Sequence, residues 1–196
     1  MTKSLDFYFD FISPYSYLAY KKIKKLKKTK KIKVNYFPIL LGALHNLNDI
    51  KAAAFINSKA KFMIKDCKMV AKKFNINFKF NSYFPINSLH LMRGTLVINK
   101  KISPCYINNF FNAYWKNNLD LRDEKNINQI LSNCKIEIKS FYKSIEQEKI
   151  KNKLKKLTLD AFNKGVFGAP TFIVNKKIFW GQDRFDYALD EFFKKN

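Results

Sequence analysis

Apolar and polar positions alternate in two short stretches near the N-terminus, residues 5–11 and residues 32–37. A period of two is typical of a half-buried β-strand. Between these stretches, residues 14–28 place apolar side chains at helical spacing and lysines at most of the remaining positions. The order strand, helix, strand forms a βαβ unit, so we expect the two strands to pair in parallel.

The pattern changes to helical spacing in the middle of the chain. From about residue 43 to residue 163 strand signals almost vanish, and no internal repeat or long linker rich in Gly, Ser or Pro interrupts the stretch. We predict helices over residues 55–74, 88–100, 104–116, 127–134, 138–146 and 150–163. The middle of the chain is therefore interpreted as one helical block.

Strand signals return after this block. Thr171–Val174 is a run of β-branched and aromatic residues, and Ile178–Trp180 follows after a short turn. Two such runs so close together predict a β-hairpin. Residues 185–193 then carry an apolar face at helical spacing. The pattern as a whole predicts an α/β protein with a helical insertion.

The composition is typical of a globular chain with one domain, or one domain and a sizeable insertion. The 196 residues are 47% hydrophobic, with 20 Phe and 10 Tyr, which is ample for a core. No apolar run reaches the roughly 20 residues of a membrane span, and the N-terminus lacks a signal-peptide pattern. Cys67, Cys105 and Cys134 show no CxxC spacing, so we expect no disulfide framework and a reducing, cytoplasmic compartment. The two histidines lie far apart and give no support for a Cys/His zinc site.

The net charge of +23 has two interpretations. It can indicate a nucleic-acid or anionic membrane partner. It can also reflect a composition rich in Lys, Asn, Ile, Phe and Tyr and poor in Gly, Pro and Arg. The lysines spread along the whole chain and do not gather in one patch, so we favour the compositional interpretation. We expect no specific nucleic-acid partner and no membrane span, although a field of this size attracts anionic ligands in general.

The first candidate site is the turn at Ser13 and Pro14, between the first strand and the first helix. Serine is a good N-cap, and proline suits the first helical position because it needs no N–H partner there. Capping alone is one interpretation of Ser13. The second is functional, since a helix N-terminus stabilises an anion and lowers the pKa of a thiolate beside it.

The second candidate site is the loop before the strand at Thr171. Pro170 belongs at the first residue of that strand, because proline cannot join a central ladder. Ala169–Pro170 is the bond at which a cis peptide costs little, although an ordinary trans bond is the alternative. A cis turn would leave the N–H and C=O of Ala169 unpaired, as an edge on which an extended peptide can lie.

These two loops carry a family resemblance. The turn Ile12-Ser13-Pro14-Tyr15-Ser16 resembles the active-site turn of DsbA-like thioredoxin folds, with serines in place of both CxxC cysteines. Gly168-Ala169-Pro170-Thr171 resembles the cis-Pro loop that faces this turn in the same fold. Together with Phe179-Trp180-Gly181-Gln182-Asp183-Arg184, the pattern is similar to the 2-hydroxychromene-2-carboxylate isomerase family, which is related to the kappa-class glutathione transferases.

The resemblance covers nearly the whole chain and implies a fold and a domain division. The fold is thioredoxin-like (βαβ, then ββα), interrupted by an all-helical insertion domain. Residues 1–42 and 164–196 would form the thioredoxin-like domain, and residues 43–163 the inserted helical domain. The family is usually dimeric, so we also expect a homodimer.

The resemblance further implies glutathione as the cofactor. Without cysteines in the turn, Ser13 is interpreted as the catalytic residue that stabilises the glutathione thiolate, and the backbone of Ala169 as its peptide contact. Gln182 and Asp183 would bind the γ-glutamyl end, although Asp183 has an alternative role as the cap of the last helix. A count along the sequence adds Asn48 and Lys59 as weaker candidates. The implied glutathione-binding set is Ser13, Pro14, Tyr15, Asn48, Lys59, Ala169, Pro170, Gln182 and Asp183.

The implied activity is isomerisation of a small aromatic anion in aromatic-compound catabolism. The substrate would be 2-hydroxychromene-2-carboxylate and the product trans-o-hydroxybenzylidenepyruvate, formed by thiolate addition, bond rotation and thiolate release. A kappa-like transferase that conjugates glutathione to an electrophile is the first alternative. A basic, non-enzymatic protein that binds nucleic acid or a membrane surface is the second.

Overall fold

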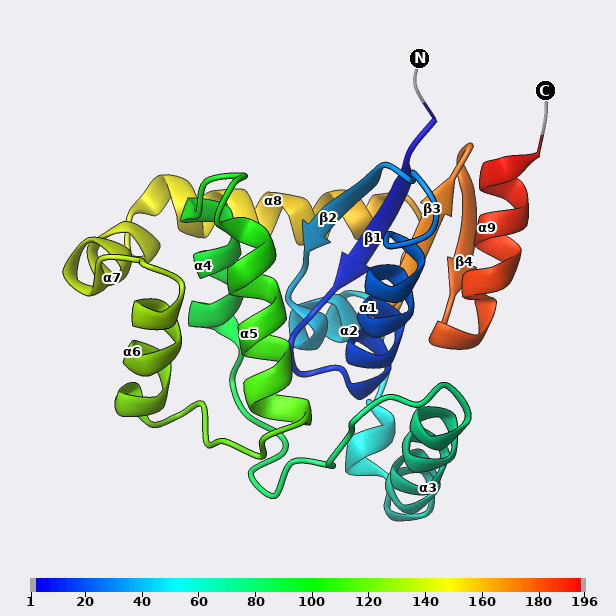
Figure 1. Ribbon diagram of the computed structural model, residues 1–196, viewed down its shortest axis with the longest axis horizontal. Coiled ribbons are helices and arrows are strands. Elements are labelled where there is room, and N and C mark those ends of the chain that lie inside the picture. The colour runs from blue at the N-terminus through cyan, green and yellow to red at the C-terminus, as the bar shows by residue number, and fades with distance from the viewer. Residues whose placement is uncertain (1–2, 195–196) are drawn as a thin grey trace.

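The computed structural model describes residues 3–194 and contains a four-stranded mixed sheet (Figure 1). The strands are β1 (Leu5–Phe9), β2 (Val34–Pro38), β3 (Thr171–Val174) and β4 (Lys177–Trp180), in the order β2-β1-β3-β4. β1 pairs with β2 in parallel, and β1–β3 and β3–β4 are antiparallel. The predicted βαβ unit and the predicted hairpin are both confirmed.

The described helices lie in the connections between the strands, except α9, which follows the last strand. They are α1 (Pro14–Leu26), α2 (Leu41–Leu47), α3 (Asn57–Lys73), α4 (Leu89–Val97), α5 (Ser103–Trp115), α6 (Glu124–Asn133), α7 (Ile138–Ile145), α8 (Glu148–Asn163) and α9 (Phe185–Phe193), with short 3₁₀ turns η1 (Ala53–Phe55) and η2 (Gln182–Arg184). The predicted helices are present, with ends displaced by a few residues. The pattern did not predict α2, which has seven residues and no capping side chain. Within residues 3–194, no helix has both the length and the apolar character needed to cross a bilayer.

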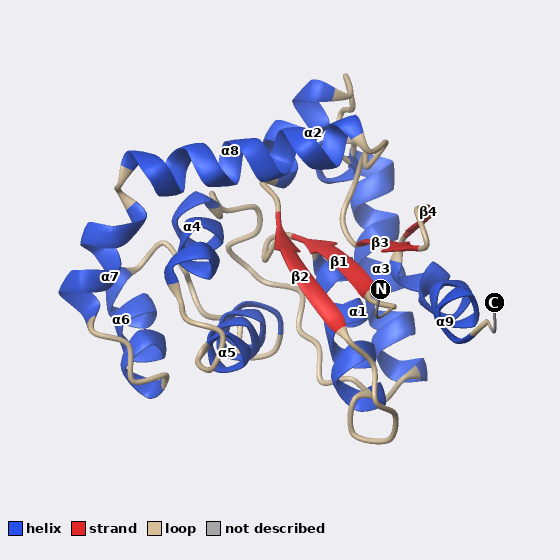
Figure 2. Ribbon diagram, turned by 90° about the horizontal axis from the view of Figure 1, so that it is seen from above, coloured by secondary structure: helices blue, strands red, loops and turns tan. Residues whose placement is uncertain are grey.

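Helices cover both faces of the sheet (Figure 2). α2 and α8 lie on one face, where Tyr8 of β1 packs in a small core with Leu44 and Ala161. The other face carries the large aromatic core beneath α1, α5 and α9. There Phe7 stacks on Phe172, with ring centroids 5.5 Å apart. The alternation of side chains along β1 thus supplies both cores.

The helical segment shares its core with the sheet. Phe111 of α5 contacts Phe9 and Phe11, with ring centroids 5.7 and 4.9 Å away. The Trp115 indole donates a buried 2.8 Å hydrogen bond to the backbone oxygen of Phe11, two residues before Ser13. The segment therefore supports the Ser13 turn directly. Its division into a separate domain at residues 43–163 stays a prediction.

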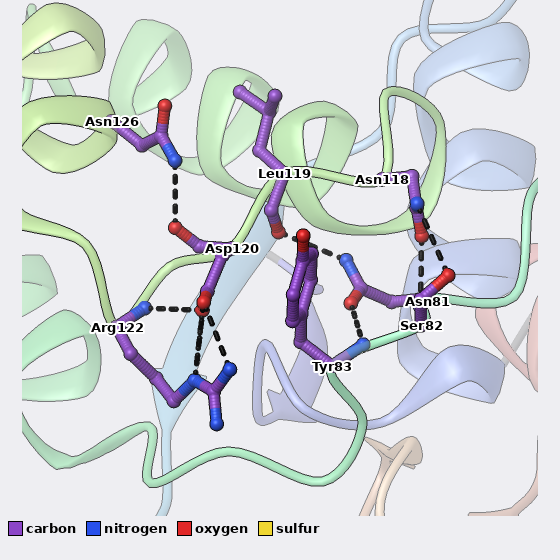
Figure 3. Close-up of polar contacts among 8 residues, drawn as sticks. All are labelled: Asn81, Ser82, Tyr83, Asn118, Leu119, Asp120, Arg122 and Asn126. Atoms are coloured by element: carbon purple, nitrogen blue, oxygen red, sulfur yellow. Dashed lines mark hydrogen bonds and ion pairs between the residues drawn. The ribbon is translucent and has the colours of Figure 1, made fainter.

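A polar network joins the loop before α4 to the α5–α6 connection (Figure 3). The amide of Asn81 donates to the backbone oxygen of Leu119 at 3.0 Å, and its side-chain oxygen accepts from the Tyr83 N–H at 2.7 Å. Asp120 binds the guanidinium of Arg122 with both carboxylate oxygens. These contacts hold the loop that carries Phe80 and Phe84, whose rings pack on Trp115.

The cysteines contradict the sequence-based expectation. Cys105 of α5 and Cys134, directly after α6, form a disulfide with a Cα–Cα distance of 5.8 Å. The side chain of Asn109 donates to both sulfurs at 3.2 Å. Packing of α5 against α6 joins residues that are 29 positions apart, which sequence spacing cannot report. The expectation of no disulfide was wrong, and with it the cysteine-based support for a reducing compartment is lost. Cys67 is free and buried.

Candidate active site around Ser13 and the proline loop

The Ser13 turn forms where the chain leaves β1. Ser13 has an extended backbone (φ −82°, ψ 115°), and its hydroxyl oxygen accepts a 3.1 Å hydrogen bond from the Ser16 N–H. Pro14 occupies the first turn of α1, where its missing N–H has no cost. The predicted capping role of Ser13 is confirmed. The same geometry directs the free N–H groups of the first turn toward the space beside Ser13.

The proline loop faces this turn, as predicted. The Ser13 hydroxyl donates a 2.8 Å hydrogen bond to the backbone oxygen of Ala169, and the Ala169–Pro170 peptide is cis. The Gly181 N–H and the Thr171 hydroxyl brace the loop through the backbone oxygens of Pro170 and Gly168. One detail differs from the expectation. The C=O of Ala169 is not unpaired, because Ser13 lies close enough to bind it.

Trp180 forms a wall beside the loop. Its ring centroid lies 4.8 Å from that of Phe167, and its indole nitrogen occupies the space in which a side chain at Gly168 would stand. Trp180 is 52% exposed. The tryptophan belonged to the motif quoted for the family resemblance, yet sequence reasoning gave it no place in the site.

A buried carboxylate supports the turn from below. Asp10 is fully buried and accepts hydrogen bonds from the Ile12 N–H at 3.1 Å and the Leu41 N–H at 2.8 Å. Burial raises its pKa to about 6, against the opposing effect of these bonds and of the Ser88 hydroxyl. Sequence reasoning missed Asp10. The available signal was an acidic residue at the end of an apolar strand.

Gln182 and Asp183 lie at the start of the η2 turn but in different surroundings. Gln182 is buried, and Lys22 of α1 donates to its side-chain oxygen at 2.7 Å and to its backbone oxygen at 3.1 Å. The Asp183 side chain is 59% exposed and lies 3.7 Å from Arg184. Among the described residues no side chain caps α9, whose N-cap position is Arg184, so the alternative role of Asp183 as that cap was wrong. Lys22 was also missed, because nothing distinguishes it from the lysines around it.

Tyr15 connects the turn to α3. It is partly buried, with Asp66 and Cys67 of α3 beside its hydroxyl. Burial raises the pKa of the Tyr15 phenol, and the neighbouring Asp66 adds to that shift. The raised pKa keeps the phenol neutral well above physiological pH.

Asn48 and Lys59 have no hydrogen bond to either loop within residues 3–194. Asn48 lies at the end of α2, where its amide donates to the Leu44 backbone oxygen at 2.8 Å. Lys59 is exposed in the first turns of α3. The structure thus brings Ser13, Ala169 and Pro170 together. Gln182 is hydrogen-bonded to Lys22 of α1. Asn48 and Lys59 make no hydrogen bond to this group within the described residues.

The arrangement can stabilise an anion but cannot exchange disulfides at the turn. Positions 13 and 16 hold hydroxyls, and the Ser16 hydroxyl is buried without a hydrogen-bond partner in the described part of the chain. No group of three or more His, Cys, Asp or Glu residues in the described part of the chain could hold a metal ion. The chemistry on offer consists of two hydroxyls, the N–H groups of a helix N-terminus and an adjacent backbone edge.

The chain belongs to the family of DSBA-like thioredoxin domains, which matches residues 4–192. Within that family it is similar to the 2-hydroxychromene-2-carboxylate isomerase of Sphingobium xenophagum, with 27% identity over 195 residues, covering 95% of this chain and 96% of that protein. It is also similar to glutathione S-transferase kappa 1 of Caenorhabditis elegans, with 26% identity over 204 residues, 95% of this chain and 89% of that protein.

Solved structures confirm the fold. A 2-hydroxychromene-2-carboxylate isomerase superposes with a TM-score of 0.88 at 23% identity, covering 95% of this chain and 92% of that one. A putative protein disulfide isomerase from Nitrosomonas europaea superposes with a TM-score of 0.71 at 13% identity, covering 97% of each chain. The thioredoxin-like fold predicted from the two terminal motifs is therefore correct.

Proposed function

We propose that the protein is a glutathione-dependent isomerase that converts 2-hydroxychromene-2-carboxylate to trans-o-hydroxybenzylidenepyruvate. The observation that supports this most is the meeting of Ser13 with the Ala169 carbonyl, at 2.8 Å, in a turn without cysteine. A DsbA-like site of this kind lacks its own thiolate but keeps the groups that stabilise one. The similarity to isomerases and to kappa-class transferases supports the same reaction chemistry.

The residues present fit glutathione. The buried Ser16 hydroxyl without a partner and the Ser13 hydroxyl both lie on the first turn of α1. Both can donate to a sulfur anion placed at the helix N-terminus. The Ser13 hydrogen now points to Ala169, so binding would turn that hydroxyl toward the sulfur. The Ala169 C=O would then be free to pair with the extended backbone of the tripeptide, as its N–H would.

The ends of the tripeptide are assigned by charge. Asp183 binds the γ-glutamyl ammonium, and Gln182, held by Lys22, fixes the position of that loop. Lys59 is assigned to a carboxylate of the tripeptide and Asn48 to its polar backbone, which requires the segment from α2 to α3 to approach the loops. Pro14 and Tyr15 form the wall of the turn next to the sulfur.

When bound, glutathione would supply a thiolate able to add to the conjugated substrate. The heterocyclic ring would open, the former double bond would rotate and the thiolate would leave again, so that no net conjugate forms. The role of Ser13 is to keep that sulfur ionised at neutral pH and to hold it in one place. Ser16 adds a second donor. The Tyr15 phenol is protonated at neutral pH, as an ordinary phenol is, and its hydroxyl lies beside Asp66 and Cys67 of α3.

A kappa-like transferase is the second candidate, and the similarity to the C. elegans enzyme favours it. The same site would serve both reactions, because both need a glutathione thiolate. They differ in whether the sulfur leaves. We further propose a small aromatic anion as the substrate class and a homodimer as the assembly.

The test incubates the purified protein with 2-hydroxychromene-2-carboxylate, with and without glutathione. The isomerase predicts conversion that needs glutathione and leaves the concentration of free thiol unchanged. A transferase would instead consume thiol in step with product and give a conjugate detectable by mass spectrometry. If the protein neither converts the substrate nor binds glutathione in a calorimetric titration, the proposal is refuted altogether.

A further inference from the structure

One segment concentrates positive charge far beyond the rest of the chain. Nine of the thirteen residues from Lys21 to Lys33 are lysine, and no acidic residue occurs between Asp10 and Asp49. The expectation that lysines form no patch therefore fails for this segment. A composition rich in lysine would distribute lysines evenly along the chain. It does not by itself explain a dense lysine cluster within a stretch that has no acidic residue.

The fold turns the segment outward. Ile23 and Ile32 are buried and anchor it, while the lysines between them face solvent. The exposed ones are Lys24, Lys25, Lys27, Lys28, Lys30, Lys31 and Lys33. We call these seven the lysine cap. They occupy the last turns of α1 and the connection to β2, and none of them forms an ion pair within residues 3–194.

Two other segments lie next to the lysine cap and together with it form a larger basic face. The Lys33 backbone oxygen accepts from the Leu5 N–H, which brings the start of β1 to the cap. The Lys3 ammonium donates to the backbone oxygen of Lys194 at 2.7 Å. The Lys30 ammonium lies 5.0 Å from the ring centroid of Phe193, which is 45% exposed. One exposed aromatic ring thus lies beside Lys30 of the cap, and Lys3 contacts the residue that follows this ring in the chain.

The face lies at the other end of α1 from Ser13. α1 has 13 residues and begins directly after Ser13, so its length puts the cap about 20 Å from the hydroxyl. Figure 1 shows this α1–β2 connection at the same end of the molecule as the start of β1 and the end of α9. Binding at the cap would leave the Ser13 turn accessible.

We propose that the lysine cap docks the protein on an anionic lipid surface. A broad face of lysine ammonium groups with one exposed phenylalanine matches a plane of anionic headgroups, and four to eight clustered basic residues are typical of such contacts. The cap holds no arginine, the residue that recognises phosphate in bidentate fashion on nucleic acids. The face also has one exposed ring beside Lys30, whereas proteins that bind single-stranded nucleic acid stack successive bases on several aromatic side chains. This proposal is independent of the proposed activity.

The test is sedimentation with vesicles of phosphatidylcholine alone or of phosphatidylcholine with phosphatidylserine. We expect binding only to the anionic vesicles, with loss of binding at about 0.5 M salt, where screening is strong. Each lysine near an anionic surface contributes roughly a factor of five. The variant with Lys27, Lys28, Lys30 and Lys31 each changed to Glu should therefore bind more than about 100-fold more weakly.

A matched variant separates the cap from net charge. Changing Lys143, Lys149, Lys153 and Lys155 to Glu alters the charge equally on exposed positions of α7 and α8. This variant should keep binding within a few-fold, and both variants should show the wild-type circular dichroism. Equal loss in the two variants would mean that only the total charge matters and would overturn the proposal. So would tighter binding to a duplex or single-stranded oligonucleotide than to the vesicles, because the partner would then be nucleic acid.

Discussion

Replacing Ser13 with Ala separates its two roles. In the structure, the hydroxyl accepts from the Ser16 N–H at 3.1 Å and donates to the Ala169 oxygen at 2.8 Å. Loss of an N-cap costs about 1 kcal/mol, and loss of the donor to a partly buried carbonyl costs about 1–2 kcal/mol. We therefore expect Ser13→Ala to lower the free energy of unfolding by roughly 2–3 kcal/mol, with or without a catalytic role.

The catalytic role adds an effect that capping does not produce. A hydrogen bond to a charged group contributes roughly 1.5–3 kcal/mol, and one pKa unit corresponds to about 1.36 kcal/mol. Without the Ser13 hydroxyl, the pKa of bound glutathione should rise by about one to two units. Turnover at neutral pH should fall about ten-fold or more, while glutathione still binds through Ala169 and Asp183 in the loop that Gln182 positions.

The assay titrates the ultraviolet absorbance of the thiolate with glutathione bound to each protein. Asp123→Ala is the matched control, because Asp123 caps α6 by accepting from the Lys125 N–H at an exposed position. It should cost about 1 kcal/mol of stability and leave the thiol pKa unchanged. If Ser13→Ala also leaves the thiol pKa and the turnover unchanged, then Ser13 is a cap alone and the reasoning fails.

Three further predictions concern redox chemistry and pH. Reduction of the Cys105–Cys134 bond, which closes a separation of 29 residues, should lower the free energy of unfolding by about 3–4 kcal/mol; equal urea midpoints with and without reductant would contradict this. With serines at positions 13 and 16, the protein should not reduce insulin disulfides, and measurable reductase activity would disprove the assignment of the turn. Burial raises the pKa of Asp10 from 3.8 to about 6, so the native state binds the proton more tightly across this window. The free energy of unfolding should then fall, by roughly 3 kcal/mol, as the pH rises from about 4 to 6. Asp10→Asn should remove this component, and unfolding free energies that run parallel with pH in the two proteins would refute it.

The sequence predicted the features that depend on local patterns. The alternation in residues 5–11, the helical spacing that follows, and the strand at Thr171 predicted strands of the sheet and most of the helices that flank it, but not α2. Serine followed by proline also identified the N-cap, because capping involves residues three positions apart. The meeting of Ser13 with Ala169 came from the family resemblance, since the two lie 156 positions apart.

The features that were missed depend on contacts between distant segments. The disulfide requires α5 and α6 to pack together, and a short helix such as α2 has too few residues for a periodic signal. Lys22 differs from the neighbouring lysines only through its hydrogen bond to Gln182, which the sequence does not reveal. In the same way, the burial of Asp10 is explained in part by the N–H of Leu41, at the start of α2, which donates to its carboxylate from 31 positions away.

Oxygen in place of sulfur at positions 13 and 16 also changes what peroxide can do to this protein. A cysteine at a helix N-terminus is readily oxidised, and its sulfinic and sulfonic forms are generally not repaired. A serine there resists this damage, while Cys67 is buried and the other two cysteines are already joined. Under the proposed mechanism the vulnerable sulfur belongs to glutathione, which is exchanged at each release. Oxidative stress would then slow the enzyme by depleting its cofactor, and activity would return when reduced glutathione is restored, without new protein synthesis.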